Sequence, residues 1–104
     1  MSSDISPEDY LKIKDKEKIM LLDVREEAER HIAKLDGGLW IPLMELPKRL
    51  KELDKKKEII CYCRTGGRSS HAAEFLRKKG FGARNLSGGL HRWHDEVDNT
   101  IIKY

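Results

Sequence analysis

The sequence predicts an α/β fold with a mostly parallel central sheet covered by helices on both faces. Short apolar runs typical of buried strands alternate with charge-rich segments of helical spacing along the whole chain. Strands separated by helices need crossover connections, and these join parallel neighbours. A length of 104 residues is typical of one domain, and no linker, repeat or low-complexity segment divides the chain. We therefore expect a single domain over residues 1–104.

The first half of the chain predicts a helix, a strand, a second helix and a second strand. Ser6 offers an N-cap, with proline at the next position. The apolar run 19–24 is short and followed by charge, as in a strand buried on both faces. Residues 25–35 suit a short helix, 36–38 suit a turn, and 39–42 suit a strand ended by proline.

The second half predicts two further helix and strand pairs and a last helix. Residues 44–53 place leucines at helical intervals, and residues 58–63 form a third apolar strand. Residues 69–80 begin with serine, carry basic residues in the last turn and end on glycine, as a capped helix does. A short strand over 83–86 and a helix over 90–97 follow.

Composition excludes several classes of function. The formal charge of +3 is mild, and the basic segment 48–57 has no interleaved aromatic residue to stack on bases, so we expect no nucleic-acid partner. No apolar run approaches the roughly 20 residues of a membrane span. The first ten residues lack the basic start and apolar centre of a signal peptide. We expect a cytoplasmic protein that does not bind membranes.

The loop after the third strand carries the candidate chemistry. Ligands of parallel α/β sheets bind at the carboxyl ends of the strands, which brings residues 23–25 and 63–69 to the same edge. Gly66 and Gly67 permit dihedrals and close approaches that let successive N–H groups turn inward as an anion-binding nest at a helix N-terminus. Such a field lowers the pKa of a thiol from ~8.5 to roughly 3.5–7.5, so we expect Cys63 to be a thiolate nucleophile.

The arginines and the aspartate near this loop have separate expected roles. Arg64 suits contact with an oxyanion or carboxylate substrate. Arg68 has two open roles, which are substrate binding and bonding to the loop carbonyls. Asp23 and Arg25 are expected to support the site, with Asp23 accepting N–H bonds from the loop or pairing with Arg68 or Arg25. The candidate residues are Cys63 as the nucleophile, Arg64, Thr65, Gly66, Gly67, Arg68 and Ser69 as the binding loop, and Asp23 and Arg25 as supporting groups.

The other candidates are weaker. Cys61 is expected to be a small buried strand residue, because its spacing from Cys63 is unfavourable for a disulfide and hence for a resolving thiol. A closed zinc site needs four ligands, and no second cysteine pair is present, so no metal is expected. His71 is a candidate for tuning Cys63, and Trp93 is either a core residue or a lip of the substrate mouth.

Four segments together resemble a single-domain rhodanese. "LLDVREEAE", "IPL", "CYCRTGGRS" and "NLSGGLHRWHDEVD" occur in matching order over nearly the whole chain. The resemblance implies the rhodanese-like fold with a five-stranded sheet. It also implies a sulfurtransferase cycle, in which Cys63 takes sulfane sulfur from thiosulfate or a persulfide and passes it to a thiol, cyanide or a sulfur carrier. No cofactor is implied beyond the transient cysteine persulfide.

A narrower resemblance concerns the partner. "AKLDGG", "ELPKRL" and "DEVDNTIIKY" look more like the rhodanese module of the adenylating enzymes that activate ubiquitin-like sulfur carriers. This resemblance implies a carrier protein, or its adenylating enzyme on another chain, as a partner.

Two other functions are open at this point. A cysteine phosphatase of related fold has a longer loop, whereas only four residues separate Cys63 from Arg68, and the loop holds no acidic residue to protonate a leaving oxygen. A rhodanese-fold binding or regulatory module is the other alternative, and the intact Cys63 argues against it. The loop length favours the sulfurtransferase.

Overall fold

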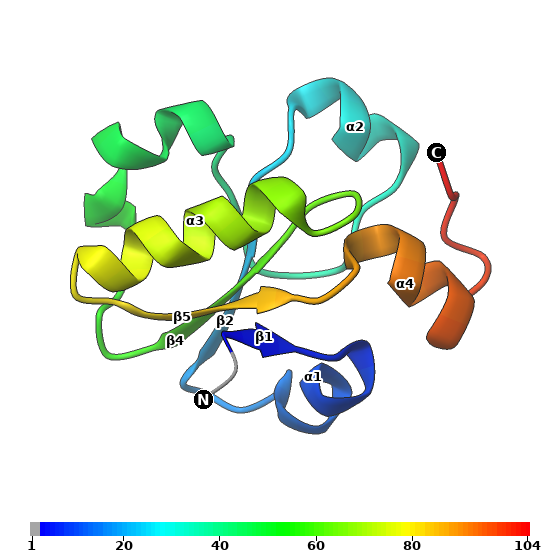
Figure 1. Ribbon diagram of the computed structural model, residues 1–104, viewed down its shortest axis with the longest axis horizontal. Helices are drawn as coiled ribbons and strands as arrows, with labels where there is room; N and C mark the ends of the chain where they lie inside the picture. Colours follow the sequence, from blue (N-terminus) through cyan, green and yellow to red (C-terminus); the bar gives the residue numbers. More distant parts are fainter. Residues whose placement is uncertain (1–2) are drawn as a thin grey trace.

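The computed structural model describes residues 3–104. Its centre is a five-stranded sheet in the order β1-β5-β4-β2-β3, and all neighbouring strands are parallel (Figure 1). The strands are β1 (Asp4–Ile5), β2 (Ile19–Asp23), β3 (Leu39–Trp40), β4 (Glu58–Tyr62) and β5 (Gly82–Leu86). The predicted parallel α/β sheet is confirmed, and β4 lies at its centre.

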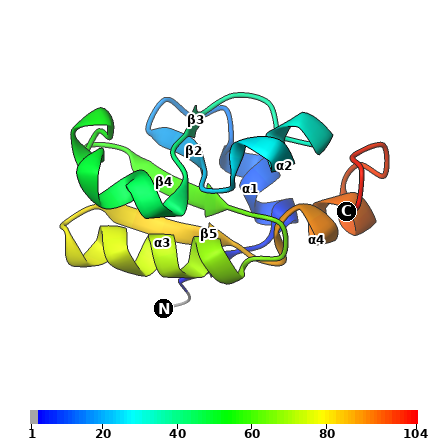
Figure 2. The same cartoon turned by 90° about the horizontal axis from the view of Figure 1, so that it is seen from above.

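Helices cover both faces of this sheet. The helices are α1 (Pro7–Ile13), α2 (Glu27–Ile32), α3 (Gly67–Lys78) and α4 (Gly89–Glu96). Figures 1 and 2 show α3 along one face and α1 on the opposite face, and α1 contacts α4. None of the helices in residues 3–104 has the length and apolar character needed to cross a membrane.

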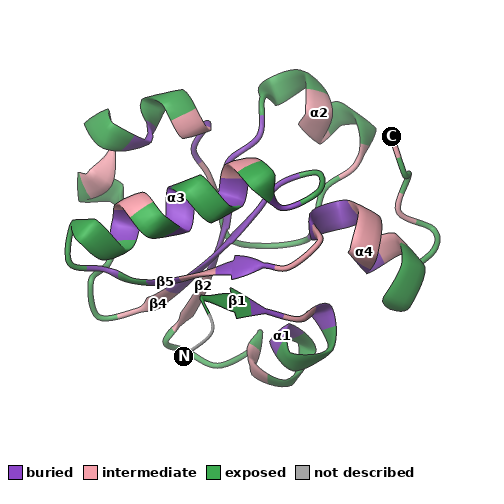
Figure 3. Cartoon of the chain, viewed as in Figure 1, coloured by how far each residue is buried: buried purple, intermediate pink, exposed green. Residues whose placement is uncertain are grey.

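The central strand divides the core into two clusters. Ile59 and Cys61 join the cluster beneath α3, whereas Ile60 and Tyr62 join the cluster beneath α1 and α4. This alternation follows from the two-residue period of a strand, and burial on both faces explains why the strand sequence is continuously apolar. Figure 3 shows β4 largely buried between helices whose outer surfaces are exposed.

The segment predicted as a helix over residues 44–53 forms two 3₁₀ helices instead, η1 (Leu43–Lys48) and η2 (Leu50–Glu52). Pro47 lies inside η1, where it lacks the N–H that an α-helix requires and its ring opposes the preceding turn. The regular helix predicted there was therefore wrong, although Leu46 still packs into the core. Two smaller differences concern short segments. The strand β1 was not predicted, and α3 begins at Gly67 and not at residue 69 as predicted.

The turn before β3 depends on a close backbone approach. Gly38 has φ +77°, and a Cβ there would collide with the carbonyl group of Leu21 in β2. Gly37 has φ +83°, but a Cβ there would meet nothing within 4 Å. A side chain at Gly37 would therefore meet only the cost of the left-handed backbone conformation. A side chain at Gly38 would meet the same cost and would also overlap the Leu21 carbonyl group.

We predict that Gly38→Ala lowers the free energy of unfolding more than Gly37→Ala does. A left-handed residue with a side chain costs about 1–2 kcal/mol, and overpacking against the Leu21 carbonyl adds about 1–3 kcal/mol at Gly38 only. Urea unfolding of the two variants measures the difference. Equal losses of stability would show that the loop moves freely away from β2.

Candidate active site

The site lies where β4 passes through a short loop into α3. Cys63 directly follows β4, and the loop reaches α3 at Gly67. Asp23 at the end of β2 pairs in register with Tyr62, and Val24 N–H donates to the Tyr62 carbonyl at 3.2 Å. Residues 23–25 and the Cys63 loop therefore share one edge of the sheet, as predicted, because their parallel strands are neighbours.

The sulfur of Cys63 is surrounded by hydrogen-bond donors. The Gly66 N–H lies 3.1 Å from Sγ, the Ser69 N–H 3.5 Å and the Ser69 hydroxyl 3.3 Å. Cys63 is only 1% exposed, so these groups take the place of water around the sulfur. Because Ser69 lies in the first turn of α3, the positive end of the helix also faces the site.

These contacts set the ionisation of the two cysteines in opposite directions. Burial acts to raise the pKa of Cys63, but hydrogen bonds from the Ser69 hydroxyl and from the N–H groups of Ser69, Gly66 and Thr65 outweigh it and lower the pKa. Burial without such donors raises the pKa of Cys61 to about 12. Both cysteines are free thiols, and only Cys63 has the surroundings of a reactive one.

The two loop glycines differ in conformation. Gly66 has φ +104°, which is the left-handed region that favours glycine, whereas Gly67 has no positive φ and is the first residue of α3. A Cβ on Gly66 would lie 3.3 Å from the Gly88 nitrogen, and one on Gly67 would meet nothing within 4 Å. The inward turn of the loop therefore depends on Gly66, and the expectation of a special conformation at both glycines was wrong for Gly67.

The start of α4 holds the outer side of the loop. Leu90 N–H donates to the Cys63 carbonyl at 3.0 Å, and His91 N–H donates to the Arg64 carbonyl at 3.1 Å. A Cβ on Gly89 would collide with both of those carbonyl groups. The loop can direct its N–H groups toward the sulfur because α4 accommodates its carbonyls. Sequence reasoning missed this role, although the paired glycines before the last helix were a signal for it.

Arg68 is paired with a carboxylate from α2. Its Nη1 and Nη2 donate to the two carboxylate oxygens of Glu29 at 2.6 and 2.7 Å. Hydrogen bonding from Arg68 holds the pKa of Glu29 at about 2, so the pair is charged near neutral pH. This geometry fits a bracing role for Arg68, through Glu29 and not through loop carbonyls. Glu29 was not among the predicted site residues.

Asp23 and Arg25 form a buried pair beside the loop. Arg25 donates to Asp23 through Nε at 3.0 Å and Nη2 at 2.9 Å, and both side chains are at most 1% exposed. Arg30 and the Tyr62 hydroxyl also donate to Asp23, each at 3.0 Å. The predicted partners of Asp23 were the loop N–H groups, Arg68 or Arg25. In the structure Asp23 pairs with Arg25. Such a fully bonded pair fixes the end of β2 next to the Cys63 loop.

Arg64 lies on the exposed side of the loop. Its Nε donates to Nε2 of His91 at 3.3 Å, and its guanidinium lies 5.2 Å from the ring centroid of Tyr104. His91 and Tyr104 are further residues that sequence reasoning did not assign to the site. They come from α4 and from the segment that follows it.

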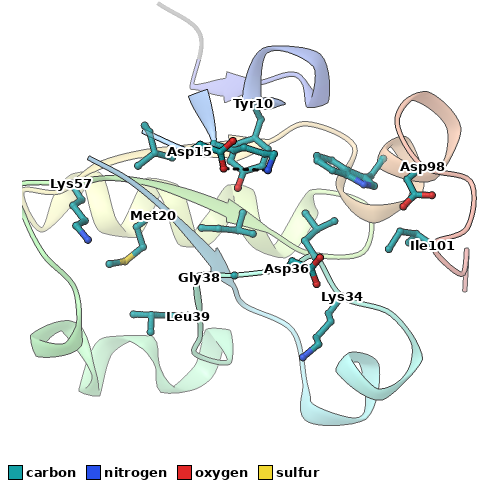
Figure 4. A pocket seen from close by; sticks show the side chains of 16 residues that line it. Tyr10, Asp15, Met20, Lys34, Asp36, Gly38, Leu39, Lys57, Asp98 and Ile101 are labelled. Atoms are coloured by element: carbon teal, nitrogen blue, oxygen red, sulfur yellow. Dashed lines mark hydrogen bonds and ion pairs between the residues drawn. The ribbon is translucent and has the colours of Figure 1, made fainter. Parts of the chain in front are cut away.

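Two of the weaker candidates lie away from the sulfur. Trp93 packs against Tyr10 with ring centroids 6.0 Å apart and lines a cavity of about 530 Å³ between α1, β2 and α4 (Figure 4). No residue of the loop 63–69 lines that cavity, so Trp93 is not a lip of the Cys63 site. His71 is exposed on α3 and is not among the donors to Cys63. Within residues 3–104, no cluster of three or more His, Cys, Asp or Glu side chains is arranged to hold a metal ion.

Known proteins share both the sequence pattern and the fold. The model of the rhodanese-like domain family matches residues 6–96. A sulfurtransferase of Allochromatium vinosum is 34% identical over 83 residues, covering 79% of this chain and 78% of the relative. The adenylyltransferase and sulfurtransferase UBA4 of Yarrowia lipolytica is 37% identical over an alignment of 103 residues, which covers 96% of this chain and 26% of that protein.

A solved structure agrees with this assignment. The rhodanese-related protein from Thermoplasma volcanium superposes with a TM-score of 0.85 at 28% identity, over 97% of this chain and 98% of that one. The fold, the position of the cysteine loop after the central strand and the family match lead to one conclusion. This chain belongs to the family of rhodanese-like domains.

Proposed function

We propose that this protein is a sulfurtransferase that carries sulfane sulfur as a persulfide on Cys63. The observation that carries the proposal is the buried Cys63 sulfur, which faces the Gly66 and Ser69 donors at the carboxyl end of the central strand. The family includes proteins named sulfurtransferases, such as the Allochromatium vinosum relative. The loop donors stabilise a sulfur anion, whether it is the thiolate or the outer sulfur of a persulfide.

The reaction takes place in two displacement steps. The Cys63 thiolate attacks the outer sulfur of a donor such as thiosulfate, a new S–S bond forms, and the S–S bond of the donor breaks as sulfite leaves with the electron pair. An acceptor nucleophile, a thiolate or cyanide, then attacks the outer sulfur of the persulfide. The S–S bond to Cys63 breaks and returns the thiolate.

We extend the acceptor class to an activated sulfur-carrier protein. The similarity to the enzyme named adenylyltransferase and sulfurtransferase supports this extension, although the chain spans only 26% of that relative. A carrier whose C-terminal carboxyl is adenylated by an enzyme on another chain is an electrophile, so the outer sulfur of the Cys63 persulfide attacks its carbonyl carbon and AMP leaves. A thiolate then attacks the Cys63 sulfur of the acyl disulfide, and the carrier leaves as a thiocarboxylate. A second thiol reduces the mixed disulfide and returns Cys63.

A phosphatase reaction has weaker support. Phosphate ester cleavage needs an acid to protonate the leaving oxygen. The carboxylate bonded to the loop is Glu29, and Arg68 holds the pKa of Glu29 at about 2, so this group has no proton to give near neutral pH. With only four residues between Cys63 and Arg68, the loop favours a single sulfur over a tetrahedral phosphate.

We predict that incubation with thiosulfate adds the mass of one sulfur atom to the intact protein. Dithiothreitol or cyanide removes the added mass, because either one attacks the outer sulfur of the persulfide. Cys63→Ser gains no mass, whereas the matched variant Cys61→Ser gains it as the wild type does. Intact-protein mass spectrometry reads all four results. A wild-type protein that never gains the mass would contradict the proposal.

We also predict that Cys63 alkylation by iodoacetamide reaches half of its maximal rate at a pH below ~8.5, the ordinary pKa of a thiol. The sign follows from the donors, which lower the pKa of Cys63 and so keep the reactive thiolate present at lower pH. Ser69→Ala removes the hydroxyl donor and raises the midpoint by about one to two pH units, since a hydrogen bond to a charged group is worth about 1.5–3 kcal/mol.

Ser70→Ala is the control for this measurement, because Ser70 is exposed on the same helix and is not among the donors to Cys63. Its midpoint should equal that of the wild type. A shift of the same size in both serine variants would assign the effect to the helix as a whole and not to the Ser69 hydroxyl.

A further inference from the structure

The segment after α4 folds back over the side of the site. Nδ1 of His94 lies 2.7 Å from the Ile101 carbonyl oxygen, and Lys103 Nζ bonds both carboxylate oxygens of Asp95 at 2.9 and 3.2 Å. These contacts hold residues 98–104 against α4 and direct Tyr104 toward α2 (Figure 1). The match to the family model ends at residue 96, and the loop predicted to carry the chemistry does not include this segment, which enters the sequence analysis only through the resemblance of "DEVDNTIIKY".

The hydroxyl of Tyr104 is fixed between two charged groups. Arg25 Nη1 donates to it at 2.6 Å, and it donates to Oε2 of Glu29 at 2.7 Å. Arg25 is fully buried against Asp23, and Glu29 is bound by Arg68, so both partners are themselves held in place. A phenol bonded on both sides by held groups has a defined ring orientation.

The ring of Tyr104 supports Arg64. The Arg64 guanidinium lies 5.2 Å from the ring centroid, and His91 meets the same ring edge-on at 6.5 Å and 87°. His91 also accepts the hydrogen bond from Arg64 Nε at 3.3 Å. The ring and the imidazole thus hold the guanidinium on two sides, by a cation–π contact and a hydrogen bond.

The arginines around the site differ in whether they are paired with a carboxylate. Arg25 and Arg30 share the carboxylate of Asp23, and Arg68 is paired with Glu29. Arg64 has no ion pair with a carboxylate among residues 3–104, and it is exposed next to the buried sulfur. An anion that approaches Cys63 therefore meets Arg64 as the guanidinium that is available for pairing.

We propose that Tyr104 is a positioning residue that holds Arg64 at the mouth of the Cys63 loop and thereby sets the preference of the site for anionic substrates. Tyr104 acts through Arg64 and does not touch the reacting sulfur. With thiosulfate as the anion, this proposal deepens the proposed function and rests on it. The alkylation test below does not need sulfur transfer, whereas the turnover test does.

The first test compares two alkylating agents that differ in charge. The measured quantity is the ratio of the rate constants for Cys63 with iodoacetate, an anion, and with iodoacetamide, which is neutral. Tyr104→Leu should lower this ratio about two- to five-fold, the range expected for an exposed cation–π contact. Tyr104→Phe keeps the ring but loses the two hydrogen bonds that orient it, so its ratio should lie between those of the wild type and Tyr104→Leu. A purely structural role would slow both reagents alike and leave the ratio unchanged.

Tyr10→Phe is the matched control, because it removes a phenol hydroxyl from the same core cluster, where Tyr10 packs on Trp93 and is not among the partners of Arg64. Its ratio should equal that of the wild type. Arg64→Leu completes a double-mutant cycle with Tyr104→Leu. If Tyr104 acts through Arg64, adding Tyr104→Leu to Arg64→Leu changes the ratio no further, and additive losses overturn the proposal.

The second test uses turnover. With thiosulfate and cyanide, Tyr104→Leu should raise KM about two- to five-fold and change kcat by less than about two-fold, because the contact concerns binding of the anion. A fall in kcat at unchanged KM contradicts the positioning role. Failure of the wild type to turn over would overturn the proposed function alone, since the alkylation ratio does not depend on sulfur transfer. If Tyr104→Leu proves unstable, Tyr104→Phe still tests the proposal, because it keeps the ring beside Arg64. An iodoacetate to iodoacetamide ratio for Tyr104→Phe as low as that of Arg64→Leu would overturn the proposal.

Discussion

The burial of one sulfur atom sets the requirements for the rest of the site. A thiolate that is cut off from water needs donors from the protein, and at Cys63 these are backbone N–H groups and one hydroxyl. Backbone N–H groups that point inward leave carbonyls that point outward. The first turn of α4 takes up two of those carbonyls, and this close approach requires glycine at Gly89. The central strand, the loop and two helices are therefore coupled through one anion site.

A second layer of charges surrounds this anion site and is mostly neutralised. Asp23 and Arg25 fix the end of β2, and Glu29 fixes Arg68, so four of the charged groups nearest the loop have structural partners. Such pairs order their surroundings but leave little charge for a ligand. The charge that remains available belongs to Arg64, whose orientation depends on His91 and Tyr104. The proposed selectivity for an anionic substrate thus rests on groups outside the loop that carries Cys63.

Much of the fold and the centre of the site could be predicted from local sequence. The buried strands, the capped helices and the Cys63 loop each have signals within a few neighbouring residues. Glu29 could not be found in this way, because it meets Arg68 from 39 residues away, and Tyr104 meets Glu29 from 75 residues away. The prediction of an α-helix over residues 44–53 was wrong because it rested on the spacing of the leucines. Pro47 lies within that segment and is incompatible with a regular α-helix there. The two-residue strand β1 is too short to have a periodicity of its own.

A crystal structure of the protein after incubation with thiosulfate would show where the transferred sulfur lies. A second sulfur should be bonded to Cys63 Sγ, inside the loop, and should accept hydrogen bonds from the inward N–H groups of residues 64–69. An outer sulfur that points away from the loop, with those N–H groups bonded elsewhere, would contradict this expectation. The same holds for sulfur bound at Cys61 and not at Cys63.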